Sequence, residues 1–397
     1  MNALNIDCKI SVPRLTVLLG LLTAFAPFST DMYLAAFPAM ARDMFTDMGH
    51  IQLTLSVFFW GLAVGQLVYG PLSDRFGRRR PLLAGILLYT LASLGLVFVR
   101  DIEWFIALRF VQAVGGCAGL VIGRAVISDA FDVAGAAKIL TIMMAVQAIG
   151  PVAAPMLGGY MLNFAPWAAQ FGFMTVLGVL CFLASWAVLP ETLAKEKRQH
   201  QSPRRLFGVF WQLFRKREFC LPVIVGATGG AIIFVFIGGS PFVLMSLYGL
   251  SETRYGLTFG LIALGTALLS QVNVLLLKRF HPRQILTGGL IFAAIFSLAL
   301  VVLVFIKGQP DIIWFIALAF MALAAEPIIY ANSAAVAMAA GRANAGSASS
   351  IIGVAQFTAA GVVNFAVSLL HNGTIMPMVG VMVLCSILAL VVLHACK

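Results

Sequence analysis

Charged side chains deep inside long apolar runs of this 397-residue chain include Asp31, Arg109 and Glu326. Asp31 belongs to the stretch from Ser29 to Pro38. A charge at the centre of a membrane helix costs about 2.5–3.5 kcal/mol even on lenient scales, so such residues usually mark a path for protons, ions or substrates. Asp31 is therefore a candidate proton carrier. The alternative is that Asp31 caps the outer end of a short helix and faces water.

Asp31 and Arg109 are expected at similar depth. With a rise of 1.5 Å per residue, Asp31 lies about 15 Å from the outer end of its run and Arg109 about 10 Å from the outer end of its own. If both face a central cavity, Arg109 favours the charged form of Asp31 and desolvation favours the neutral form. A small rearrangement of the helices then changes the protonation state of Asp31. The alternative is a fixed buried ion pair that only orients two helices.

Glu326 is the only acidic residue inside an apolar run of the second half. It lies about 22 Å along that run, close to the middle of the membrane. Three roles remain open. Glu326 can bind a cationic substrate, carry a second proton, or stay protonated and hydrogen-bond within the helix packing.

The composition places these residues in a membrane protein with many spans. The chain is 61% hydrophobic and 10% charged, whereas soluble chains carry about 25% charged residues. A span needs about 20 mostly apolar residues. The first run is too long for the core of a cleavable signal, so we expect it to stay as a helix. Twelve runs qualify: 14–40, 50–70, 82–99, 103–128, 137–160, 167–189, 220–247, 255–277, 285–306, 311–338, 346–370 and 374–395.

The distribution of basic residues predicts the orientation of the spans. The net charge is +11, and 20 of the 26 Lys and Arg residues fall in segments on one side of the membrane. The positive-inside rule makes that side cytoplasmic, together with both termini. The loop after the fourth span, with Asp129, Asp132 and Lys138, fits less well. Because position explains the basic excess, we expect no nucleic-acid partner.

One long polar segment, 190–219, separates six runs from six. Equal halves joined by a charged linker predict two parallel repeats with a substrate site near the midplane between them. We therefore expect a six-helix bundle over 1–190, a cytoplasmic linker over 191–219 and a second six-helix bundle over 220–397. The alternative is that 190–219 is merely a long loop.

The loop from Gly70 to Pro81 combines glycines, an aspartate and four arginines. The glycines permit a tight turn, Asp74 can accept hydrogen bonds at a helix N-terminus, and the arginines can bridge to carboxylates such as Asp129. An arginine cluster that only sets orientation explains the charges but not the spacing. The expected charge network, which includes Arg124, uses Gly70, Asp74, Arg75, Gly77, Arg78 and Asp129.

These motifs resemble those of a known family. The Gly70–Pro81 loop resembles the signature between helices 2 and 3 of the major facilitator superfamily, where such a network is thought to latch the two halves in the outward-facing state. Asp31-Met32-Tyr33-Leu34 resembles a motif of the Bcr/CflA drug-resistance transporters, and Arg109–Gln112 resembles a helix 4 motif linked with proton transfer. Residues 154–159 resemble the antiporter motif, and the similarity extends to 239–244 and 346–350.

The chain departs from these patterns at three positions. Ala35 stands where the family usually has proline, Ala113 where glycine often follows the helix 4 glutamine, and Ala154 at the first glycine of the antiporter motif. The third departure weakens the case for export. Gly and Pro nearby still make this span prone to bend. The residues assigned to the antiporter motif are Gly150, Pro151, Pro155, Gly158 and Gly159.

Amides and aromatic rings in the spans supply a candidate lining for a substrate. Amides can line a cavity or bond across helices, and rings can form an apolar wall or simply pack. The candidate substrate-binding set is Asp31, Tyr33, Phe59, Gln112, Gln147, Phe236, Glu326 and Gln356. The sequence contains no phosphate-binding loop, no metal-ligand cluster and no Ser/His/Asp arrangement, and its six cysteines are scattered. We therefore expect no enzyme activity, no cofactor and no metal.

These features predict an all-α membrane protein of twelve transmembrane helices in two six-helix bundles. The resemblance implies a monomeric, proton-coupled exporter of small drug-like compounds across the bacterial inner membrane, with the lipid bilayer and protons as its other partners. A proton-coupled carrier of a metabolite such as a nucleoside or amino acid is the alternative. A membrane-embedded enzyme or signalling protein fits the two similar halves less well.

Overall fold

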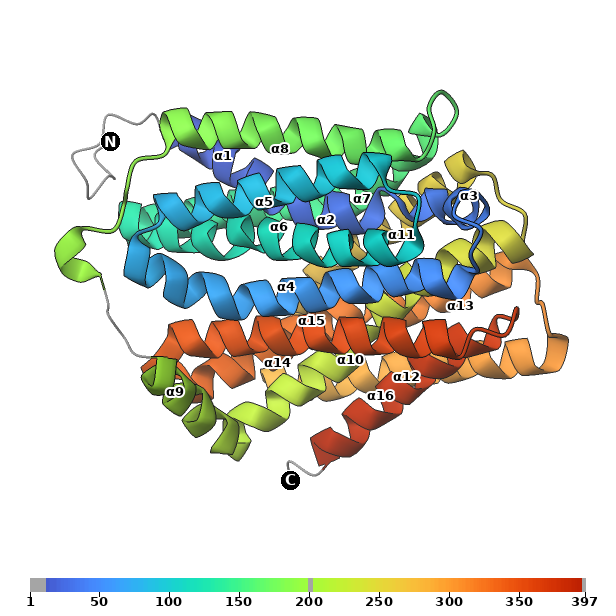
Figure 1. Ribbon diagram of the computed structural model, residues 1–397. Coiled ribbons are helices and arrows are strands. Elements are labelled where there is room, and N and C mark those ends of the chain that lie inside the picture. The colour runs from blue at the N-terminus through green and yellow to red at the C-terminus, as the bar shows by residue number, and fades with distance from the viewer. Residues whose placement is uncertain (1–11, 199–202, 395–397) are drawn as a thin grey trace.

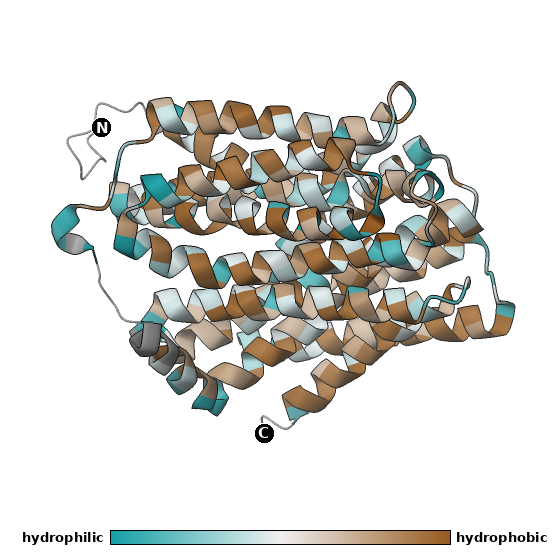
Figure 2. Cartoon of the chain, in the orientation of Figure 1, coloured by the Kyte–Doolittle hydropathy of each residue, from teal (hydrophilic) through white to brown (hydrophobic). Residues whose placement is uncertain are grey.

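The computed structural model describes residues 12–198 and 203–394, and within them twelve helical segments are long and apolar enough to cross a membrane. The number of spans predicted from the sequence is confirmed. The segments run side by side along the molecule (Figure 1). Apolar side chains predominate along their middle stretches, and polar residues gather at the two ends (Figure 2).

The first six spans are built from eight helices and one 3₁₀ segment. The first span is itself in four pieces, and each of the next five is a single helix. The elements are α1 (Val12–Thr23), α2 (Phe25–Asp31), η1 (Leu34–Ala36), α3 (Phe37–Asp43), α4 (Met48–Phe76), α5 (Arg79–Phe98), α6 (Ile102–Ala130), α7 (Val133–Met161) and α8 (Ala168–Val188).

The remaining six spans follow a connection that contains η2 (Lys195–Lys197) and a helix the sequence analysis missed, α9 (Pro203–Arg215). α9 packs against α10 and α15. The spans are α10 (Arg217–Pro241) with η3 (Phe242–Leu247), α11 (Glu252–Leu276), α12 (Pro282–Lys307), α13 (Ile312–Ala324) with α14 (Glu326–Ala340), α15 (Ala345–Leu369) after η4 (Arg342–Asn344), and α16 (Met376–His394).

The spans pack as two bundles of six. In the first, α4 and α5 pack on α6, and α8 packs on α5. In the second, α10 contacts α14, α15 and α16, and α12 contacts α14 and α16. The bundles meet along two helix pairs, α4 with α15 and α7 with α11. Figure 1 shows the first pair lying side by side. The linker boundaries at 191 and 219 stay a prediction.

Three spans are interrupted, and the candidate carboxylates lie at two of the interruptions. In the first span α2 ends at Asp31 and a 3₁₀ segment follows. In the seventh, α10 ends at Pro241 and continues as a π-helix. In the tenth, α14 begins at Glu326, directly before Pro327. Proline lacks the N–H that would continue the helical ladder, and irregular backbone at membrane depth is tolerated where it is enclosed by protein or lines a cavity.

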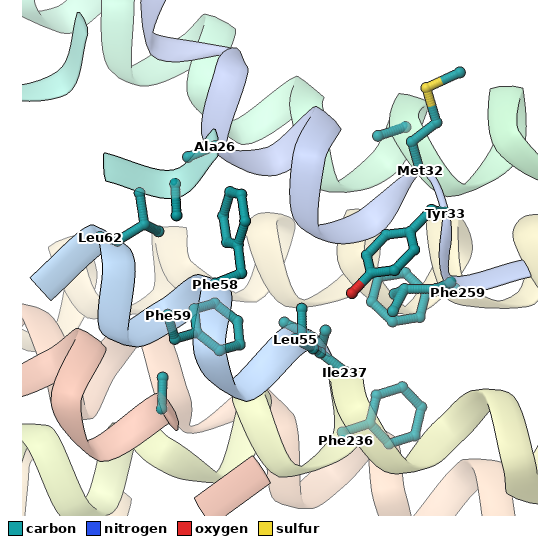
Figure 3. Close-up of a cluster of buried hydrophobic side chains, with 14 of the residues drawn as sticks. Ala26, Met32, Tyr33, Leu55, Phe58, Phe59, Leu62, Phe236, Ile237 and Phe259 are labelled. Atoms are coloured by element: carbon teal, nitrogen blue, oxygen red, sulfur yellow. The ribbon is translucent and has the colours of Figure 1, made fainter. Parts of the chain in front are cut away.

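The two ends of the bundle differ. We call the end where α1 begins and α16 ends the termini side, and the opposite end the far side (Figure 1). On the far side the bundles are in contact through η1 with α10 and α11, and through α3 with η3. A single cluster of buried side chains spans both bundles here. It includes Tyr33 and Leu55 of the first bundle and Phe236, Ile237 and Phe259 of the second (Figure 3).

Candidate functional site

The Asp31 carboxylate is buried where the two bundles meet. Its residue is 3% exposed, and its Oδ1 has no hydrogen-bond partner among the described residues. It lies within electrostatic range of Tyr255 on α11. The Tyr255 hydroxyl is hydrogen-bonded to Ser240 of α10 at 3.0 Å. A carboxylate of the first half therefore lies within electrostatic range of a polar pair of the second half. Because Asp31 is buried, the alternative that it faces water is wrong for this structure.

Arg109 is fully buried inside the first bundle. Its guanidinium donates to the Oε1 atom of Gln112 at 2.5 Å and to the backbone carbonyl of Ser29 at 2.8 Å. The rings of Tyr33 and Phe58 lie 4.3 and 4.2 Å from its central carbon. Neutral dipoles and ring faces thus surround the charge, an arrangement that offsets part of the desolvation penalty.

The ion pair expected between Asp31 and Arg109 is not formed. Among the described residues, no salt bridge within 4 Å includes either side chain. The reason is rotational: Ser29 faces Tyr89 of α5, with a hydroxyl–hydroxyl distance of 2.9 Å. Two residues correspond to about 200° around an α-helix, so Asp31 points to the other side of α2, toward α11. The depth of each residue along its helix, which is all that the sequence provides, does not determine this direction. The roles of Asp31 and Arg109 in proton coupling stay predictions.

The antiporter motif holds α7 against the segment that follows Asp31. A Cβ atom on Gly158 would collide with the backbone carbonyl of Met32, the residue after Asp31. A Cβ on Gly150 would lie 2.6 Å from the ring of Pro27 in α2. Pro151 and Pro155 both lie inside α7. The small residues of the motif therefore permit the close approach of α7 to both ends of α2.

The same motif brings α7 against the second bundle. A Cβ on Gly159 would collide with the backbone carbonyl of Glu252, at the start of α11. From the other side, a Cβ on Gly256 would collide with the Pro155 carbonyl. A Cβ on Gly260 would lie 2.9 Å from the Val152 carbonyl. Glycines on both helices thus form a close-packed seam between the bundles in the far half, next to Asp31.

On the termini side, Arg78 is the centre of the predicted charge network. Its guanidinium donates to Asp129 at 2.8 Å and to Asp74 at 2.5 Å. Burial lowers the pKa of Arg78, but the hydrogen bonds and charges of Asp129 and Asp74 outweigh it, so the pKa is raised. The structure therefore brings together three of the predicted latch residues. Arg75 is exposed and lies over the Phe76 ring.

Glu191 completes this network and was not predicted. Its carboxylate accepts from the backbone N–H of Arg78 at 2.7 Å and of Arg79 at 3.3 Å, at the start of α5. Gly77 has a φ of +88°, and a Cβ there would collide with the Glu191 carboxylate. Gly70, by contrast, lies within α4 with open space around its Cβ position. The turn therefore requires Gly77 and not Gly70. The sequence signal that could have found this residue is a carboxylate two positions after the sixth apolar run, at the same end of the spans as the arginine loop.

The network lies within the first half. Among the described residues, every ion pair within 4 Å joins two residues of the chain before position 199. A latch between the halves through Asp74 or Arg78 is therefore not formed in this conformation, and its formation in another conformation stays a prediction.

Replacing Glu191 by Ala is expected to lower the melting temperature of the purified protein by a few degrees. The substitution leaves the N–H groups of Arg78 and Arg79 without their acceptor, and losing such a helix-capping interaction costs about 0.5–2 kcal/mol. Thermal unfolding in detergent measures the effect. Glu196, which is exposed in the same segment, provides the matched control as Glu196→Ala. Equal melting temperatures for the two variants would argue against the capping role.

The predicted substrate-binding residues fall into separate groups. Tyr33 and Gln112 are enclosed with Arg109 in the first bundle; the Tyr33 hydroxyl is 3.1 Å from that of Thr54, and Gln112 donates to Ser93 at 2.8 Å. Phe236 packs against Phe259 of α11. Among the remaining candidates, Phe59 lies in an aromatic group described below, and Gln147 and Gln356 are half-buried. Their roles in binding stay predictions.

Glu326 lies in the second bundle, apart from Asp31. It is partly exposed, and no hydrogen bond or ion pair is found for it among the described residues. A Cβ on Gly230 of α10 would lie 3.6 Å from its Oε1. Tyr330, one turn further along α14, is within electrostatic range of both Glu326 and Arg124 of α6. In the described part of the chain, no group of three or more His, Cys, Asp or Glu residues is arranged to hold a metal ion.

Comparison with other proteins identifies the family. The sequence profile of the Major Facilitator Superfamily matches residues 19–364. The chain is 32% identical over 375 residues to the uncharacterized MFS-type transporter YdgK of Bacillus subtilis, covering 93% of this chain and 91% of that protein. It is 28% identical to a bicyclomycin resistance protein homolog of Haemophilus influenzae, with coverage of 94% and 93%. It is 30% identical to the multidrug resistance protein MdtL of Shewanella oneidensis, with coverage of 83% and 82%.

The fold is also found in solved structures. A crystal structure of a D-xylose-proton symporter superposes with a TM-score of 0.75 at 14% identity, covering 95% of this chain and 97% of that one. At this identity the likeness concerns the fold. Twelve spans in two bundles, a matching profile over most of the length and transporter relatives agree with one another. The chain belongs to the Major Facilitator Superfamily and is a multi-pass membrane transporter of small molecules, not an enzyme.

Proposed function

We propose that this transporter exports small drug-like compounds in exchange for protons, in the manner of the Bcr/CflA drug-resistance transporters. The observation that carries the proposal is Asp31. Its carboxylate is buried and incompletely hydrogen-bonded at the junction of the bundles, and it lies where α2 ends. An intramembrane carboxylate of this kind is suited to take up and release a proton as its surroundings open and close.

The proposed orientation places the termini side in the cytoplasm of a bacterium, with the spans in the inner membrane and the protein acting as a monomer. The basic residues between the spans favour this orientation. The contacts of η1 with α10 and α11, and of α3 with η3, close the bundles together on the far side. In this orientation these contacts would seal Asp31 from the outside, as in an inward-facing state.

The proposed cycle follows from that state. When the seam between α7 and α11 separates, Asp31 becomes accessible from the outside and binds a proton there. Protonation weakens the hold on substrate and favours return to the inward-facing state, and loss of the proton to the cytoplasm restores binding. The energy comes from the proton gradient. The names of the relatives in Haemophilus and Shewanella support drugs as the exported compounds.

The test uses purified protein in vesicles that carry a pH gradient. A panel of antibiotics, dyes and nucleosides is added, and the collapse of the gradient is followed with a pH-sensitive dye. We expect drug-like compounds, but not nucleosides, to collapse the gradient. A collapse caused by nucleosides alone would replace drug export by metabolite transport. Labelled drug that moves without any effect on the gradient would contradict proton coupling.

A further inference from the structure

The two intramembrane carboxylates occupy different settings. Asp31 is the last residue of α2, and 3% of it is exposed. Glu326 is the first residue of α14 and is partly exposed. In this conformation a ligand can therefore reach the second carboxylate more readily than the first.

An aromatic group lies beside Glu326. Phe59 of α4 packs against Phe234 of α10 with ring centroids 4.9 Å apart, and against Phe357 of α15 at 6.5 Å. Phe234 follows Gly230 by one helical turn, so both face the same side of α10. Gly230 is the residue next to the Glu326 carboxylate. Phe59 is buried, but Phe234 and Phe357 are partly exposed, as Glu326 is.

The face of α14 that carries Glu326 is also within electrostatic range of the first bundle. Tyr330, on the same face of α14 as Glu326, is reached electrostatically by Arg124 of α6. Arg124 is exposed, and among the described residues it forms no ion pair within 4 Å with Glu326. Among the described residues, the Glu326 carboxylate therefore has no cationic partner within 4 Å.

We propose that Glu326, with the rings of Phe234 and Phe357, forms a binding site for a lipophilic organic cation, separate from the proton site at Asp31. The proposal rests on the proposed export function and names its substrate class. The carboxylate supplies the opposite charge, and the ring faces attract a cation and pack against its apolar surface. Gly230 leaves room for the ligand beside the carboxylate.

The experiment measures equilibrium binding of tetraphenylphosphonium to the purified full-length transporter in detergent. This cation carries a permanent charge, so its own titration does not complicate the result. Glu326→Gln keeps the size of the side chain and removes its charge, and we expect it to weaken binding about tenfold or more. Phe234→Leu is expected to weaken binding about fivefold, in the range of cation–π interactions.

Matched variants show whether a loss of cation binding is specific to Glu326 and Phe234 or follows from any such substitution. Glu218→Gln, at an exposed position of α10, and Phe305→Leu, at an exposed position of α12, are expected to leave the affinity within twofold. The proposal is overturned if the wild-type protein does not bind the cation, or if Glu326→Gln binds it as tightly as the wild type does.

Two further outcomes are distinguished. A Glu326→Gln variant that binds the cation normally but exchanges fewer protons per substrate would make Glu326 a second proton carrier and would overturn its role as counter-ion. Conversely, the wild-type protein could bind the cation through Glu326 and yet exchange no protons. That result would support the cation site and refute the proposed antiport.

Discussion

Replacing Asp31 by Asn is expected to abolish gradient-driven export while the protein still folds and inserts into the membrane. Asparagine has nearly the same size and remains compatible with a buried site that already lacks a partner for Oδ1. It cannot take up or release a proton, so the gradient no longer drives the cycle. Transport in vesicles with an imposed pH gradient should fall to the level of empty vesicles. Exchange of substrate across the membrane without a gradient should continue.

The control for this variant is Asp311→Asn, at an exposed aspartate on the far side, directly before α13. It should transport at the wild-type rate. If gradient-driven export by Asp31→Asn proceeds at the wild-type rate, Asp31 is not the coupling residue, and its burial reflects only the packing around the end of α2.

Replacing Gly158 by Ala is expected to reduce transport about tenfold or more. The added Cβ would collide with the Met32 carbonyl. Because both atoms belong to backbone or lie directly on it, the strain is relieved only by moving α7 away from the first span. The far side then closes poorly. A cysteine placed at the buried Ala36 position should react faster with a membrane-impermeant maleimide added from that side.

Gly172→Ala is the matched substitution, because a Cβ at Gly172 in α8 would meet no atom within 4 Å. Alanine favours a helix more than glycine does, so this variant should be as stable as the wild type or slightly more so, with normal transport. Unchanged transport and unchanged labelling in Gly158→Ala would show that the close contact with Met32 does not control closure of the far side.

The fold was largely predictable because membrane spans depend on hydropathy and length, which the sequence displays directly. The contact between Arg78 and Asp129 was also predictable, since opposite charges at the same end of adjacent helices meet. Several features of the candidate site were not predictable. The direction in which Asp31 points depends on the rotation of α2 within the bundle, which depth along the helix does not determine.

The second unpredicted feature is the break before Glu326. The dipeptide Glu326-Pro327 indicates a kink, but the sequence does not show which side chains the kink brings together. Gly230, the neighbour of Glu326, belongs to a helix nearly 100 positions earlier in the chain. The same limit applies to Glu191, whose partners are the backbone N–H groups of Arg78 and Arg79 in a distant loop.

Proton coupling through Asp31 is tested most directly by proton release on substrate binding. A transported drug is added to the unbuffered, purified transporter near neutral pH, and the change in pH is recorded for the wild type and for Asp31→Asn. The wild type should release protons in proportion to the substrate bound, and Asp31→Asn should bind substrate without releasing them. Equal proton release from both proteins would contradict the assignment of Asp31 as the residue that exchanges the proton for the substrate.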